Sequence, residues 1–294
     1  MVTRPIIQGT AMLAPMEKAI RARRRFWRRH FTLLLGSAIL IAAIAAAVFA
    51  PLLTPYDPTS IDPLSPLAPP LTSGHPLGTD SYGRDILARI LFGGRIDLTI
   101  GFGATIVTVV VGSIVGLIAG YFGGLVDTVL MRVVDIFYAF PFFVLIVAVI
   151  SILGPGILNM FVAIWITGWI TYARIVRGET LRARQQEYVT AARALGYSHL
   201  RIMVRHILPN VVSYAVIFSM VDAVGNILLG AALGFLGLGA QPPSPEWGTM
   251  IADGQNFLLT SWWMSTMPGL AIVIVGVGFS FVGDGIADIL RPSA

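Results

Sequence analysis

The chain has 294 residues, of which 56% are hydrophobic and only 12% charged, and its mean hydropathy is +0.80. A water-soluble globular domain has no use for so much apolar surface, so the composition indicates that lipid is the solvent for most of the chain. The net charge of +5 comes from arginines between apolar runs, a pattern that sets membrane topology and does not indicate nucleic acid binding. The lack of cysteine excludes disulfides and thiolate metal sites.

The N-terminal tail, residues 1–30, carries eight basic residues against one acid, Glu17, and we expect it to be cytoplasmic. The apolar run from Phe31 to Leu53 follows. It is too long for the hydrophobic region of a secretory signal peptide, the alternative for such a start, and it lacks a small-residue cleavage site. We therefore predict an uncleaved first transmembrane helix over residues 31–53.

Residues 54–96 are predicted to form an extracytoplasmic loop. The segment His75-Pro-Leu-Gly-Thr-Asp-Ser-Tyr-Gly-Arg-Asp85 leads there into an amphipathic stretch that ends at Arg95. We expect this stretch, residues 86–95, to lie along the outer membrane surface before the chain enters the second span.

Five further apolar spans are predicted within a transmembrane domain over residues 97–288. Their ranges are 98–122, 136–153, 157–173, 211–230 and 268–282. With six spans both termini, including the short tail 289–294, are cytoplasmic, and the loop 240–267 is outside. The inner loop 174–205 carries seven arginines against two acids, as cytoplasmic loops do. Gly112, Gly116 and Gly120 lie four residues apart, a spacing that predicts close helix packing.

The cytoplasmic segment EYVTAARALGYSHLRIMVRHILPN, residues 187–210, is the most specific pattern in the chain. We predict a first short helix from Glu187 to Leu195 with Val189, Ala192 and Leu195 on one face. Gly196 is expected to adopt a positive φ and end it, and Ser198 to cap a second short helix. Pro209 would then begin a new element. Such a bent knob suits docking in a groove of a soluble partner; the alternative is an ordinary basic loop.

This spacing resembles the EAA loop of ATP-binding-cassette (ABC) importer permeases, in which Glu-Ala-Ala is followed after three residues by Gly and then by a Leu-Pro pair. Ala191, Ala192, Gly196 and Pro209 match. Thr190 replaces the usual Glu and His206 the usual Ile. The segments 75–95 and 234–248 are similar to the dipeptide/oligopeptide/nickel branch of that superfamily. The resemblance implies an all-α, six-helix type I importer domain whose coupling loop lies within residues 174–210, with these loop residues contacting an ATPase: Glu187, Thr190, Ala191, Ala192, Arg193, Leu195, Gly196, Tyr197, Arg201, Arg205, His206 and Pro209.

The resemblance also implies partners. These are a second homologous permease, ABC ATPase subunits and an extracytoplasmic substrate-binding protein, assembled in a prokaryotic inner membrane and surrounded by lipid. The only lysine, Lys18, is not in a phosphate-binding loop, so ATP and Mg²⁺ are expected on the partner ATPases, and no cofactor or enzyme activity in this chain. The four histidines lack zinc-ligand spacing.

The implied cargo is a di- or oligopeptide, with nickel, glutathione or modified sugars as alternatives within the branch. A secondary transporter driven by an ion gradient is the alternative from another class, but the sequence shows no internal repeat of the kind such folds carry.

Asp222 lies near the middle of the fifth predicted span. A carboxylate there is costly in lipid and is expected to face the bundle interior or a water-filled path. Two roles stay open: part of the translocation path, or a structural hydrogen bond.

Overall fold

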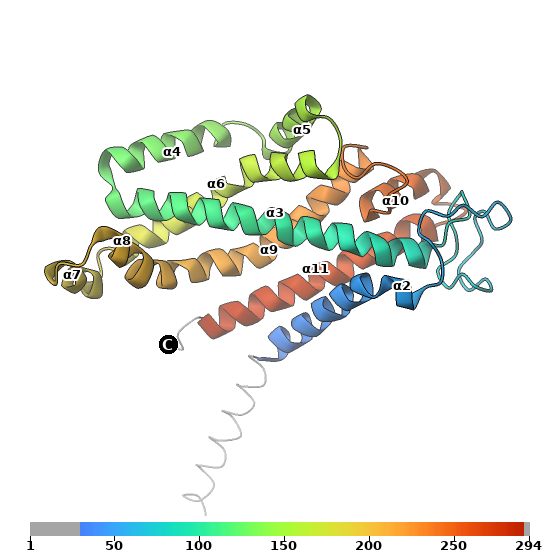
Figure 1. The fold of residues 1–294 in the computed structure, drawn as a ribbon, viewed down its shortest axis with the longest axis horizontal. Helices are drawn as coiled ribbons and strands as arrows, with labels where there is room; N and C mark the ends of the chain where they lie inside the picture. Colours follow the sequence, from blue (N-terminus) through green and yellow to red (C-terminus); the bar gives the residue numbers. More distant parts are fainter. Residues whose placement is uncertain (1–29, 291–294) are drawn as a thin grey trace, which may run out of the picture.

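The computed structural model describes residues 30–290, which are helical and contain no strand beyond isolated bridges (Figure 1). Residues 1–29 and 291–294 lie outside the described residues, and with them most of the predicted cytoplasmic tails, residues 1–30 and 289–294. The helices are, in chain order, His30–Val48, α2 (Ala50–Leu53), α3 (Ile86–Phe122), α4 (Gly124–Tyr138), α5 (Phe142–Leu153), α6 (Ile157–Ala183), α7 (Glu187–Ala194), α8 (His199–Ile202), a π-helical turn (Met203–Ile207), α9 (Leu208–Phe235), α10 (Trp247–Gly254), a 3₁₀ turn (Gln255–Phe257) and α11 (Trp263–Leu290).

The long helices form a bundle in which α3 packs most extensively against α6 and also contacts α9. The first helix lies on α11, where the side chain of Leu40 approaches Gly278. Helices α7 and α8 lie at one end of the bundle (Figure 1). The segment 54–85 and α10 lie at the opposite end. We call the end with α7 and α8 the knob end, and the end with the segment 54–85 the loop end.

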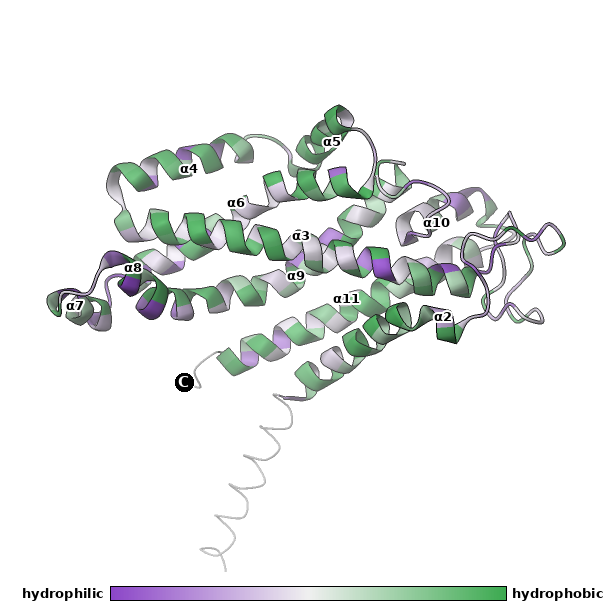
Figure 2. Cartoon of the chain, viewed as in Figure 1, coloured by the Kyte–Doolittle hydropathy of each residue, from purple (hydrophilic) through white to green (hydrophobic). Residues whose placement is uncertain are grey.

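Within residues 30–290, five helices are long and apolar enough to cross a membrane, and a sixth span results if the bent pair α4 and α5 counts as one. Figure 2 shows the apolar colouring along these helices and hydrophilic residues toward the two ends of the bundle. The predicted all-α membrane architecture is confirmed.

The third predicted span, residues 136–153, differs from a single helix. Helix α4 begins already at Gly124, and α4 and α5 meet at an angle of 84°. The break has a local cause. Pro141 cannot donate a backbone hydrogen bond and disfavours a helical conformation at Phe140, so α4 stops at Tyr138.

The pattern predicts that residues 86–95 form a separate segment along the membrane surface. The structure shows that this prediction is wrong. These residues are the first part of α3, a continuous helix of 37 residues whose beginning is capped by the Asp85 side chain, which accepts from the N–H of Ala88 at 2.7 Å. Ile86 and Arg89 are buried inside the protein. Protein therefore surrounds Arg89, while Arg95 is exposed and donates to the carbonyls of Ala47 and Val48.

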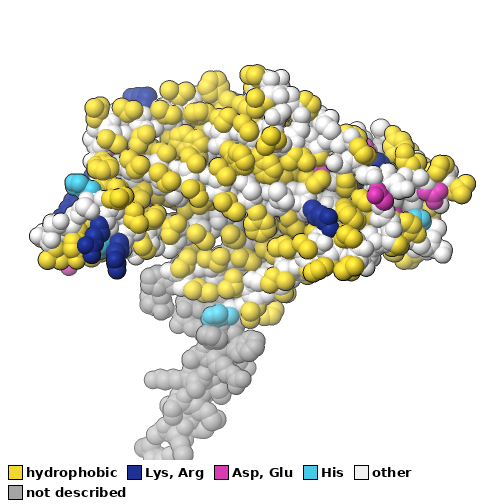
Figure 3. Space-filling view, in the orientation of Figure 1, with side chains coloured by type: hydrophobic (Ala, Val, Ile, Leu, Met, Phe, Trp, Pro, Cys, Tyr) yellow, Lys and Arg dark blue, Asp and Glu magenta, His cyan; other side chains and the backbone are white. Residues whose placement is uncertain are grey.

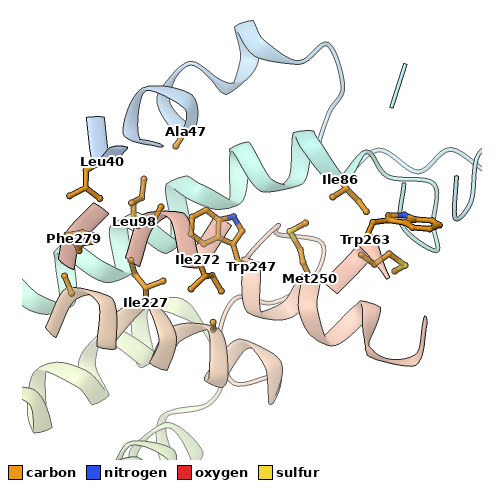
Figure 4. Close-up of a cluster of buried hydrophobic side chains, with 14 residues drawn as sticks. Leu40, Ala47, Ile86, Leu98, Ile227, Trp247, Met250, Trp263, Ile272 and Phe279 are labelled. Carbon is orange, nitrogen blue, oxygen red and sulfur yellow. The ribbon is translucent and has the colours of Figure 1, made fainter. Parts of the chain in front are cut away.

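The three spaced glycines pack as predicted, against α6. A side chain at Gly120 would meet the Cβ of Thr180 at 2.7 Å, and Gly112 and Gly116 lie against the backbone of Trp169 and Ala173. An apolar cluster around Trp247 joins the first helix, α3, α9, α10 and α11 (Figure 4). These two contacts fix the positions of α6 and α9, which carry the candidate site.

Candidate functional site

The segment 187–210 forms two short helices joined at a glycine. Helix α7 is followed by Gly196 with φ 77°, and the Ser198 hydroxyl caps α8 by accepting from the N–H of Arg201 at 3.4 Å. Both local predictions are confirmed. The bend follows from Gly196, because a residue with a side chain adopts this conformation only at a cost.

Helix α9 begins at Leu208 with Pro209 in its first turn, as predicted, although no break separates it from α8. Residues 199–235 follow one helical path, in which a π-helical turn joins α8 to α9. Pro209 has no N–H to donate to the preceding turn, and its ring crowds the backbone there. The wider turn, in which the N–H of Leu208 donates to the carbonyl of Met203, accommodates it.

The apolar face predicted for docking is mostly buried within the chain. Val189 and Ala192 pack in a cluster with Tyr121 from the end of α3 and with Ile202 and Ile207. This face covers the bundle and is closed to any partner, because the knob folds back on the ends of α3 and α6.

A different apolar set faces outward at the knob end. Leu195 is 71% exposed, Leu200 68% and Val204 51%. Tyr188, in the first turn of α7, is exposed as well. Of these four, only Leu195 is among the coupling residues predicted from the sequence. Leu200 and Val204 are four residues apart, a helical spacing that places both on one face. Whether that face is exposed depends on which side of the knob the bundle covers.

The arginines of residues 174–205 divide into two groups. Arg193, Arg201 and Arg205 are exposed and form no ion pair within the described part of the chain, although Arg193 lies 5.4 Å from the ring centre of Tyr121 and Arg201 4.2 Å from that of Tyr197. The other four have internal partners: Arg174 with Asp135 at 2.7 Å, Arg177 with Asp127 at 2.6 Å, Arg182 with Glu179 at 3.0 Å, and Arg184 with the carbonyl of Gly120 at 3.0 Å.

Basic side chains gather at the knob end and acidic ones at the loop end, with a hydrophobic surface between them (Figure 3). Four other predicted coupling residues are exposed at the knob end: Glu187, Thr190, Ala191 and Pro209. Tyr197 and His206 are half-buried, with ring centres 5.7 Å apart. His199, which the prediction left out, has its Nδ1 2.8 Å from the Tyr121 hydroxyl and ties α8 to the end of α3.

Asp222 lies at the middle of α9 and is half-buried. Its Oδ2 accepts from the Tyr172 hydroxyl at 2.8 Å and from Nδ2 of Asn226 at 3.2 Å. Asn226 also donates to the Thr105 hydroxyl at 2.9 Å, which links α9 to α3. The predicted structural hydrogen bond therefore exists.

Asp222 also lines a cavity of about 280 Å³. Its other walls come from the α4–α5 elbow and from α6: Phe137, Tyr138, Phe140, Phe142, Leu145, Thr167, Ile170 and Thr171. The carboxylate is thus held in place by the bundle and is open to the cavity at the same time.

The two remaining motifs fold together at the loop end. Nδ1 of His75 lies 2.9 Å from Oδ2 of Asp85, and Arg84 donates to Asp80 at 2.6 Å. Arg89 lies 3.7 Å from the same Asp80 carboxylate. All five side chains are buried, so this motif holds the loop together.

The segment 234–248 supplies α10 and its cap. The Glu246 carboxylate accepts from the N–H groups of Gly248 at 2.7 Å and Thr249 at 2.8 Å, and the backbone N–H of Trp247 donates to Asp97 at 3.1 Å. Burial raises the pKa of Glu246. Among the described residues no group of three or more His, Asp or Glu side chains is arranged to hold a metal ion.

Comparisons with known proteins agree with this architecture. Residues 112–294 match the family described as binding-protein-dependent transport system inner membrane component, and residues 20–70 match the N-terminal TM domain of oligopeptide transport permease C. The inward-facing MetNI methionine ABC transporter has the same fold, with a TM-score of 0.56 at 20% identity over 69% of this chain and 96% of that chain.

Individual relatives are similar to this chain over most of its length. The dipeptide transport system permease protein DppC of Alkalihalophilus pseudofirmus is 40% identical, over 90% of each chain. The glutathione transport system permease protein GsiD of Pectobacterium atrosepticum is 39% identical, over 99% of this chain and 96% of the relative. The probable D,D-dipeptide transport system permease protein DdpC of Escherichia coli is 39% identical, over 88% and 87%. The chain therefore belongs to the binding-protein-dependent transport system inner membrane component family, in the branch that contains these dipeptide and glutathione permeases.

Proposed function

We propose that the chain is a permease subunit that couples ATP hydrolysis on a partner ATPase to solute import through its knob, residues 187–207. The observation that carries the proposal is the division of the knob into a buried inner face and an exposed outer face. Val189 and Ala192 attach it to the bundle. Leu195, Leu200 and the unpaired Arg201 remain available to a groove with apolar walls and acidic rims.

This arrangement suits transmission of movement. Because the π-helical turn joins α8 to α9 without a break, a displacement of the knob carries α9, and with it Asp222, along the same helix. ATP and Mg²⁺ belong to the partner ATPases in this proposal. A second permease completes the path, and an extracytoplasmic binding protein delivers the solute.

We assign di- or oligopeptides as the cargo, because relatives along nearly the whole chain are named dipeptide permeases. Glutathione, nickel and modified sugars are the alternatives. The knob end, which carries the unpaired arginines, is assigned to the cytoplasm of a prokaryotic cell and both termini with it. We also assign Asp222 to the translocation path, so Asp222→Leu should abolish uptake while the subunits still assemble.

The docking surface is tested by Leu200→Asp in the complete transporter. Leu200 is exposed, so the change should leave the permease folded but place a charge in a desolvated contact. We expect the ATPase that copurifies with the permease to fall roughly tenfold or more. The matched control is Leu259→Asp, a fully exposed leucine in the segment between α10 and α11. Equal copurification in both variants would show that the knob does not bind the ATPase.

The bend is tested by Gly196→Asp. Its matched control is Gly237→Asp, because Gly237 has φ 74° against 77° for Gly196 and both have open space around the missing side chain. Both substitutions impose the same backbone strain, roughly 1 kcal/mol or more. Only Gly196→Asp should abolish the stimulation of ATP hydrolysis by the loaded binding protein. Stimulation at the wild-type level in that variant would contradict the coupling role.

A further inference from the structure

The Asp222 carboxylate has no cationic partner within the described residues. Both of its hydrogen bonds fall on Oδ2, from the neutral Tyr172 hydroxyl and the neutral Asn226 amide. Its counterparts nearby differ, since Asp127 and Asp135 are each paired with an arginine of α6. A carboxylate inside a membrane-spanning bundle is costly to keep without a positive charge. Asp222 is therefore organised by its neighbours but not neutralised by them.

The cavity beside Asp222 has aromatic walls. The α4–α5 elbow contributes Phe137, Tyr138, Phe140 and Phe142. Aromatic ring faces attract cations, and more strongly where water is excluded. One of these rings already does so, because the guanidinium of Arg174 lies 3.7 Å from the ring centre of Tyr138. Arg174 is already paired with a carboxylate, because it donates to Asp135 at 2.7 Å.

We propose that this cavity is a binding subsite for an ammonium group of the cargo. The subsite combines a preorganised carboxylate on α9 with aromatic rings on the elbow, and the hydroxyls of Thr167 and Thr171 complete its α6 wall. Its volume of about 280 Å³ holds the end of a cargo molecule and not a whole oligopeptide. The inference rests on the proposed transport function, to which it adds the charge of the group that is received.

The electrostatic part of the proposal is tested in a chain that has no cysteine of its own. Thr171→Cys places one thiol in the cavity wall with little change in volume. In the complete transporter without binding protein, we would compare the labelling of this thiol by the trimethylammonium-ethyl and the sulfonatoethyl methanethiosulfonates. The products on this chain are separated by mass. We expect the ratio of cationic to anionic labelling to exceed that of a free thiol roughly tenfold or more, because a carboxylate acts on both reagents with opposite sign.

The carboxylate is identified by two further substitutions in the Thr171→Cys background. Asp222→Asn keeps the shape and an acceptor for the Tyr172 hydroxyl, and it should return the ratio to that of a free thiol. The control Asp127→Asn removes a carboxylate on the neighbouring helix α4 whose partner, Arg177, does not line the cavity, and it should leave the ratio high. Equal ratios in the Asp222 variant and the parent, or a thiol that neither reagent reaches, would overturn the proposal.

The origin of the ammonium group is resolved by protection of the same thiol. Alanyl-alanine carries only an α-ammonium, Nα-acetyl-lysine methylamide only a side-chain ammonium, and N-acetyl-alanine methylamide neither. Slower labelling with the first compound alone assigns the subsite to the peptide amino terminus. Slower labelling with Nα-acetyl-lysine methylamide alone assigns the subsite to a lysine side chain. Slower labelling with both ammonium compounds assigns it to ammonium groups in general. Protection by the neutral compound to the same extent, or by none of the three, would contradict the proposal.

This test is independent of the coupling proposal. It measures labelling with neither binding protein nor ATP, whereas the Gly196 and Leu200 variants are read out by stimulated ATP hydrolysis and copurified ATPase. If the thiol showed no preference for the cationic reagent while the Gly196 and Leu200 variants behaved as expected, only the subsite would be rejected. Failed coupling results with a retained preference would reject only the docking role of the knob.

Discussion

The two ends of the bundle both carry arginines and treat them in opposite ways. At the loop end Arg84 and Arg89 are only 7% and 2% exposed and share the carboxylate of Asp80. At the knob end Arg193, Arg201 and Arg205 are exposed and lack an ion pair in the described part of the chain. The first arrangement pairs both arginines with carboxylates inside the protein, while the second leaves charges for something outside it.

The contrast shows that a specific motif need not be a contact surface. The segments 75–95 and 234–248 carry as much family resemblance as the knob, yet the structure uses their charged residues to hold loop, α3 and α10 together. Of these three segments, the knob carries exposed apolar side chains beside three arginines that form no ion pair in the described part of the chain. A resemblance identifies which residues matter, and the packing identifies what they do.

The orientation of the two ends gives the largest expected effect. In intact cells a membrane-impermeant thiol reagent should label Leu64→Cys at the loop end and leave Ser198→Cys at the knob unlabelled until the membrane is opened. Both positions are exposed, Leu64 by 92%, and the native chain contributes no thiol. A buried position such as Asp80 would be silent on either side. Labelling of Ser198→Cys in place of Leu64→Cys would reverse the assignment of inside and outside.

The buried charge cluster at the loop end should be essential for stability. Asp80→Asn leaves Arg84 and Arg89 buried with only Asp253, whose carboxylate lies 3.4 and 3.9 Å from them. Breaking a buried pair in this way costs about 3–5 kcal/mol, because it leaves uncompensated charge in the interior. We expect a large fall in the unfolding midpoint of the purified protein, followed by tryptophan fluorescence.

Two controls sharpen this comparison of the ends. Asp57→Asn changes an exposed acid in the same loop, and Arg201→Ala removes an exposed arginine from the knob. Both should leave the midpoint close to that of the wild type. If Arg201→Ala were as destabilising as Asp80→Asn, the knob charges would be structural and the distinction between the ends would fail.

Local features of the site were predictable from sequence and long-range ones were not. The bend at Gly196 and the cap at Ser198 depend on adjacent residues, so the pattern specified both. The burial of Val189 depends on Tyr121, which is distant in sequence and adjacent only in the fold. No local pattern reveals that contact, and the outward face of the knob was therefore misassigned.

The same reason explains the third span. The stretch before residue 136 contains Asp127 and Asp135, and acidic side chains are costly in a membrane helix. Arginines on α6 pair with both carboxylates and allow α4 to begin at Gly124. Pro141 is a local cause of the elbow that follows, but the direction of the elbow depends on packing against α6. The aromatic wall of the Asp222 cavity was for this reason beyond sequence reasoning.

The smallest expected effect concerns Glu246, which has no counterpart at the knob end. Burial raises the pKa of its carboxyl above the ordinary value of 4.5, so between 4.5 and the raised value the folded state binds more protons than the unfolded state. By linkage, the free energy of unfolding falls as pH rises through this window, by about 1.4 kcal/mol for each pH unit that separates the two pKa values. The unfolding midpoint of the wild type should thus decline from pH 4.5 toward neutral pH. Glu246→Gln keeps an acceptor for the N–H groups of Gly248 and Thr249 and should flatten this decline. The same decline in the wild type and the variant would place the titrating group elsewhere and leave the Glu246 carboxylate as a cap alone.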